Sequence, residues 1–141
     1  DSLMSNKEIF SNNPLQGVGI EQVVTELVEQ YGWELLHAYM RLNCFKNNPD
    51  VKSAVKFLRK TQWAQEKVEN FYLYRLKNLP RPDDVNYELP PRDRVIPADQ
   101  KPGEPCELSF TDAKRIHAKK EAKQLARARK QRSSASNPWG N

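Results

Sequence analysis

The sequence predicts an all-α protein: a compact four-helix domain, followed by a proline-rich linker and a basic, conditionally helical C-terminal tail. Apolar residues before residue 80 recur at helical spacing, with no convincing alternating strand pattern. Seven prolines then fall within residues 80–105, and the last stretch is rich in Ala, Lys, Arg and Gln. We therefore expect a four-helix domain over 13–79, an extended, mostly disordered linker over 80–108 and a basic helix over 109–132. Residues 1–12 and 133–141 are expected to be flexible.

The first two helices are predicted over residues 17–31 and 33–40. In the first, one apolar stripe at helical spacing consists of Ile20, Val23, Val24, Leu27, Val28 and Tyr31. Gly32 suits a helix stop, because glycine tolerates a positive φ. The outward face of this helix carries Glu26 and Glu29, and acids there would repel phosphate. This helix is therefore not expected to bind nucleic acid.

Two further helices are predicted over residues 49–60 and 62–78. Asn48 suits the cap of the third helix, Pro49 its first position, and Asp50 the positive end of its dipole. Thr61 is the expected cap of the fourth helix. Its apolar face is predicted to consist of Ala64, Val68, Phe71 and Tyr72.

Charge is distributed unevenly along the 141 residues, although the net charge is only +5. Lys and Arg number ten against nine acids in residues 1–79, four against eight in 80–112, and nine against one in 113–141. The chain thus combines a near-neutral domain, an acidic connector and a strongly basic tail.

The third helix is the candidate binding surface of the domain. At 100° per residue, four cations share an arc of roughly 100° beside the apolar face; they are Lys52, Lys56, Arg59 and Lys60. Lys46, Ser53 and the helix N-terminus at Asn48 are expected to add phosphate contacts. Spacing alone leaves open the alternative that these cations form an ordinary solvated helix face.

The basic tail is the stronger electrostatic signal and suits a polyanion. The cations expected to bind nucleic acid there are Lys114, Arg115, Lys119, Lys120, Lys123, Arg127, Arg129, Lys130 and Arg132. Ile116 and Leu125 are the only large apolar residues of this segment, too few for the wide apolar face that membrane binding needs. A disordered, solubilising tail is the alternative.

Signals for catalysis are poor, and we expect no enzyme, no cofactor and no metal site. His37 and His117 lie in different segments and have no metal-ligand spacing to Cys44 or Cys106. The two cysteines do not form a disulfide framework, no apolar run is long enough to span a membrane, and the N-terminus does not read as a signal peptide. We therefore expect a cytoplasmic protein, with nucleoid association as a further option.

Residues 13–73 resemble a small bacterial domain family, named VF530 after a locus tag and long catalogued as a domain of unknown function. The resemblance lies in NPLQGVGIEQVVTELVEQYGWELL, then CF, then NPDVKSAVKFLRKTQWAQEKVENFYL, and its most specific part is KFLRKT followed by WA and KVE. It implies a compact four-helix fold likened to the duplex-DNA-binding C-terminal domain of the RecA recombinase, and a DNA-binding role. The family often has Pro after the Thr where this chain has Gln62.

The predicted function is non-enzymatic binding of nucleic acid, with duplex DNA favoured, through backbone phosphates and with little sequence specificity. One alternative is an RNA- or ribosome-associated protein. Another is a protein-interaction adaptor that uses Pro138 and Trp139 near the C-terminus. The acidic linker is also expected to mask a basic surface when no polyanion is bound.

Overall fold

The computed structural model describes residues 12–47 and 49–136, with side chains described as far as residue 132. This part of the chain is all-α and contains no strand, as the sequence predicts. Its helices are α2 (Ile20–Tyr31), α3 (Trp33–Met40), η1 (Asn43–Phe45), α4 (Val51–Lys60), α5 (Gln62–Phe71), η2 (Tyr72–Leu76), α6 (Asp84–Tyr87), η3 (Pro91–Asp93) and α7 (Phe110–Ser136). Residues 1–107 and 108–141 form two separate units.

Helices α2 and α3 follow one another with a single residue between them. Gly32 adopts a φ of +82°, which glycine reaches without the Cβ clash of other residues, and its amide donates to the carbonyl of Val28. Helix α2 ends there and α3 begins directly after it. Arg41, in the left-handed region with a φ of +53°, ends α3.

The next helical pair differs from expectation at its ends. Asp50, rather than Asn48, caps α4, and the Thr61 side chain makes no capping hydrogen bond to α5. The predicted fourth helix over 62–78 divides into the α-helix α5 and the π-helical turn η2, where the amide of Lys77 reaches the carbonyl of Tyr72. Periodicity predicts a helix here, but it does not reveal a local change in winding.

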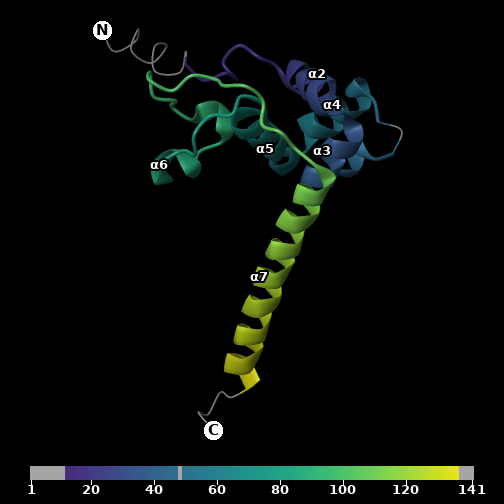
Figure 1. Ribbon diagram of the computed structural model, residues 1–141, viewed down its shortest axis with the longest axis vertical. Coiled ribbons are helices and arrows are strands. Elements are labelled where there is room, and N and C mark those ends of the chain that lie inside the picture. The colour runs from purple at the N-terminus through teal and green to yellow at the C-terminus, as the bar shows by residue number, and fades with distance from the viewer. Residues whose placement is uncertain (1–11, 48, 137–141) are drawn as a thin grey trace. The chain divides into compact units, whose positions relative to one another are not determined.

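Helices α2, α3, α4 and α5 enclose the core, and α2 packs against each of the other three (Figure 1). The predicted inner faces are confirmed for most of their residues, although Val28 and Tyr31 of the first stripe are only half-buried. The buried set from these helices consists of Ile20, Val23, Val24, Leu27, Leu36, Met40, Ala54, Val55, Leu58, Ala64, Val68 and Phe71.

Residues 80–107, here named the strap, lie against the helices and do not form the extended, disordered linker that was expected. Figure 1 shows the green chain beyond α6 returning alongside the helices. The side chain of the buried Asn13 donates to the carbonyls of Pro91 and Arg94 at 3.0 and 2.9 Å. Ile96 is buried as well.

The far end of the strap is also fixed to the helices. The hydroxyl of Tyr31 lies 3.1 Å from the carbonyl oxygen of Arg75 and 2.9 Å from that of Cys106. The amide of Cys106 donates to that same Arg75 carbonyl, and the amide of Gly103 donates to Lys77. The many prolines predict disorder because they exclude regular secondary structure. An irregular segment can nevertheless be held in place by hydrogen bonds to its carbonyls and by single side chains.

Candidate nucleic-acid interface

Helix α4 separates its apolar and basic residues onto different sides. Ala54, Val55 and Leu58 are buried, and the four cations of its basic face are all exposed: Lys52, Lys56, Arg59 and Lys60. The predicted sharing of one face by these cations therefore agrees with the burial pattern. Their role in binding stays a prediction.

None of these four cations forms an ion pair within the described residues. By contrast, Lys77 pairs with Glu26 at 3.5 Å, and Arg92 pairs with Glu69. An unpaired, exposed cation can meet a phosphate without first breaking a protein contact. Glu26 also accepts from the Tyr72 hydroxyl at 2.9 Å. This acid, one of the two expected on the outward face of α2, is therefore bound to other residues of the domain.

The N-terminus of α4 is occupied by its own carboxylate. Asp50 accepts from the amide of Ser53 at 2.9 Å and from its hydroxyl at 3.1 Å, and the amide hydrogen bond lowers the pKa of Asp50. This geometry favours a capping role for Ser53 over the expected phosphate contact. Asn48, the other residue expected there, lies outside the described residues. A phosphate is better accommodated along the cationic side of α4.

A second positive region adjoins α4 through η1, which packs against it. Lys46 is exposed directly after η1, as its candidate role requires. The pKa of His37 is lowered, first by burial and then by the positive charges of Lys46 and Arg41. Arg41, exposed at the turn that ends α3, carries a further positive charge that acts on His37, and no periodic pattern in the sequence indicates this.

The strap turns Arg92 and Arg94 inward and its acids outward. Glu69 is only 2% exposed, and Arg92 donates to it and to the carbonyls of Leu15 and Val18. Arg94 is buried and donates to Asn70 and to the carbonyl of Leu89. The exposed acids of the strap are Asp83, Asp84, Glu88, Asp93, Asp99, Glu104 and Glu107.

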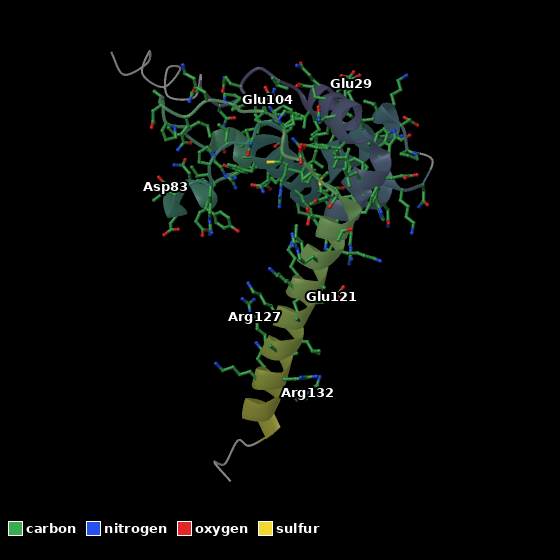
Figure 2. All side chains as sticks on the ribbon, in the orientation of Figure 1. Glu29, Asp83, Glu104, Glu121, Arg127 and Arg132 are labelled. Atoms are coloured by element: carbon green, nitrogen blue, oxygen red, sulfur yellow. The ribbon has the colours of Figure 1, made fainter. Side chains whose placement is uncertain are left out.

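The exposed charge of the strap is consequently more acidic than its composition suggests. Arg81 and Lys101 are its only exposed cations. Figure 2 shows Asp83, the cap of α6, and Glu104 further along the strap. Such a surface repels phosphate, which restricts a nucleic-acid contact on this unit to the other charged regions.

Helix α7 contains all nine candidate cations of the tail, and each of them is exposed. Arg115 pairs with Asp112 at 2.6 Å across one helical turn. Figure 2 shows Arg127 and Arg132 projecting from α7. Every side chain from residue 118 to residue 132 is exposed, so this part of the helix has no buried face of its own.

Other site types find little support in the described part of the chain. It holds no group of three or more His, Cys, Asp or Glu residues arranged for a metal ion, and no helix long and apolar enough to cross a membrane. One open cavity of about 350 Å³ is lined by residues that include Glu26, Lys77 and Gly103. Burial raises the pKa of the Cys44 thiol, which disfavours a reactive thiolate. The expected partner motif at Pro138 and Trp139 lies outside the described residues.

Comparison with known proteins gives one family match. Residues 11–73, under half of the chain, match the family model described as DNA-binding protein VF530. The match spans α2 to the first residues of η2, and therefore includes the whole of α4. A search of curated proteins found no match.

Proposed function

We propose, from the match of residues 11–73 to the family model described as DNA-binding protein VF530, that this chain binds duplex DNA through its backbone phosphates. The observation that carries the proposal is the basic face of α4, with four exposed cations that lack carboxylate partners within the described residues. Phosphates are the natural ligands of such a surface, because each neutralised phosphate releases a counterion. The protein acts as a binding protein and not as an enzyme.

Binding with little sequence specificity follows from the side chains present on this face. Base readout in the major groove relies on Arg, Asn or Gln side chains placed against base edges. The basic face of α4 holds three lysines and one arginine, Arg59, and the lysines act mainly as point charges. Contacts of this kind set affinity and orientation without reading sequence.

Helix α7 supplies a second attachment in this proposal. Its nine exposed cations suit a polyanion from any side of the helix, and two attachments on one chain raise the effective concentration of the second. Because an all-round basic helix also suits structured RNA, an RNA- or ribosome-associated function is the second candidate. If the chain binds duplex DNA, its proposed location is the cytoplasm, in association with the nucleoid.

The test replaces Lys52, Lys56, Arg59 and Lys60 with Ala in the full chain and measures duplex-DNA affinity over a salt series. Each lost phosphate contact should flatten the slope of log affinity against log salt by about 0.9. A matched control replaces Arg81 and Lys101, the two exposed cations of the strap, and should leave the slope unchanged. Equal slopes for the wild-type chain and the α4 variant would contradict the assignment of α4, and equal competition by structured RNA would favour the second candidate.

A further inference from the structure

Trp63 is the most exposed aromatic side chain among the described residues, at 63%. The indole therefore presents a large apolar surface to water that folding leaves unburied. Trp33 provides the contrast within the same domain. It is half-buried and its ring centroid lies 5.7 Å from that of Phe45.

No aromatic contact accounts for the Trp63 indole. The rings of Tyr31 and Tyr39 both contact Phe71, whereas Trp63 has no ring or cation–π contact within the parts of the chain that are described. Helix α5 buries Ala64 and Val68 on its inner side. Trp63 lies outside that side, so the core does not need the indole.

The cations of α4 come next to this indole in the chain. Only Thr61 separates α4 from α5, and the Cα atoms of Lys60 and Trp63 can be no more than about 11 Å apart, the length of three trans peptide steps. Arg59 and Lys60 are exposed in the last turn of α4. The indole is thus close in the chain to two exposed cations.

We infer that Trp63 is a base-stacking position, which binds an unpaired nucleobase while Arg59 and Lys60 hold the backbone beside it. This inference rests on the proposed nucleic-acid function and adds a ligand class to it: DNA with a gap or a single-stranded segment. An exposed aromatic ring beside cations is the arrangement by which proteins bind single strands, because every base has a face that can stack and every nucleotide carries a phosphate.

An unpaired base fits this site better than a base within an intact duplex. In a duplex both faces of each base are already stacked, and an indole reaches them only by insertion that unstacks a step and bends the DNA. A protein partner fits less well, since the surrounding cations would have to be desolvated against an apolar surface. A nucleic acid supplies both a base that can stack on the indole and phosphates that can bind the cations.

The experiment compares the full chain with Trp63→Ala and Trp63→Phe variants on three labelled DNAs of equal length: an intact duplex, the same duplex with a short gap, and a single strand. Loss of one stacked base should weaken binding of the gapped and single-stranded DNAs by roughly tenfold. Duplex affinity should change less than twofold. Trp63→Phe should restore most of the loss, because the phenyl ring still stacks.

Salt dependence and a control variant separate stacking from other effects. Trp63→Ala removes no charge, so the slope of log affinity against log salt should stay that of the wild-type chain. Val85→Ala shortens another exposed apolar side chain, 75% exposed on α6, and should change none of the three affinities. Matching far-ultraviolet spectra and unfolding midpoints would show that both variants fold.

The outcomes distinguish the inference from the function on which it rests. Unchanged affinity of Trp63→Ala for gapped DNA, with a duplex salt slope that still depends on α4, would overturn the base-stacking role alone. An equal loss on all three DNAs would also overturn it, because it would indicate insertion into the duplex. If the wild-type chain bound none of the DNAs, the proposed function would fall, and this inference with it.

Discussion

Helices α4 and α7 are both basic, yet they hold their cations in opposite ways. On α4 the cations share one side, because Ala54, Val55 and Leu58 fix the other side in the core. On α7 every side chain from 118 to 132 is exposed, so the cations point in all directions. The folded core gives α4 a surface of defined shape, whereas α7 offers charge without a preferred side. Their contributions to binding should therefore respond differently to changes in the fold.

The largest expected effect tests the dependence of α4 on the strap. Replacing Arg92 with Ala leaves the buried Glu69 carboxylate without its ion-pair partner. This loss should lower the free energy of unfolding by about 3–5 kcal/mol. The measurement is urea denaturation of the full chain, followed by far-ultraviolet circular dichroism. Because α4 depends on this core, its DNA contribution should be lost under conditions that unfold residues 1–107.

Two controls sharpen this experiment. Lys101→Ala removes an exposed strap cation and should leave the urea midpoint unchanged. Adding Glu69→Gln to Arg92→Ala removes the unpaired charge and should recover part of the lost stability. If Arg92→Ala unfolded at the wild-type midpoint, the strap would not be a stabilising part of the domain.

A chain ending at Glu107 tests the other side of the comparison, because it lacks α7 and keeps the helices and strap. Losing nine exposed cations should reduce duplex affinity at low salt by more than tenfold and flatten the salt slope by about 0.9 for each lost phosphate contact. The urea midpoint of residues 1–107 should stay as in the full chain. An unchanged slope would show that α7 does not contact DNA.

The acidic side of the strap should have a smaller effect of opposite sign. Changing Asp84, Glu88 and Asp93 to their amides removes three exposed negative charges and should tighten duplex binding by about two- to fivefold at low salt. Asp83 is left in place because it caps α6, accepting from the amide of Asn86 at 2.8 Å. The gain should disappear at high salt. Unchanged affinity at low salt would count against the expected masking of the basic surfaces.

The smallest expected effect concerns the pKa of His37. Burial and the charges of Lys46 and Arg41 lower this pKa, and a phosphate near these cations would offset their repulsion. Binding should therefore raise the pKa of His37 and take up a fraction of a proton. Duplex affinity should accordingly increase slightly as the pH falls through the pKa of the complex towards the lower pKa of the free protein. Titration of the His37 ring protons by NMR, with and without duplex DNA, measures the shift.

Lys46→Ala provides the matched check on that titration. It should raise the pKa of His37 in the free protein by removing one of the two charges that lower it. It should also shrink the further rise on DNA binding. The same His37 pKa with and without DNA would indicate that no phosphate lies near Lys46.

The sequence predicts the helices well and the strap poorly, for one physical reason. Periodic apolar residues such as Val23, Leu27 and Val55 identify a buried helix face, because burial and helical geometry impose the same spacing. The strap is anchored instead by Asn13, Arg92 and single carbonyls distant in the chain, and this leaves no periodic pattern. Composition then points to disorder, although the segment is ordered.

The same limit applies to the candidate interface. Spacing places the four cations of α4 on one face, which the exposure pattern supports. It does not reveal that Asp50 binds Ser53, or that the charges of Arg41 and Lys46 both act on His37. These are contacts of turns and helix ends. They depend on backbone angles, such as the positive φ of Arg41, that the residue type does not dictate.

The most direct test of the central claim is a two-dimensional amide NMR titration of the full chain with a short duplex DNA. The basic face of α4 predicts that the amides of Lys52, Lys56, Arg59 and Lys60 shift together, while those of Glu88 and Asp93 on the strap do not. Their shifts should reverse when salt is added. Shifts confined to α7, or centred on the strap with α4 unchanged, would contradict the assignment of α4 as the DNA-binding surface of the domain.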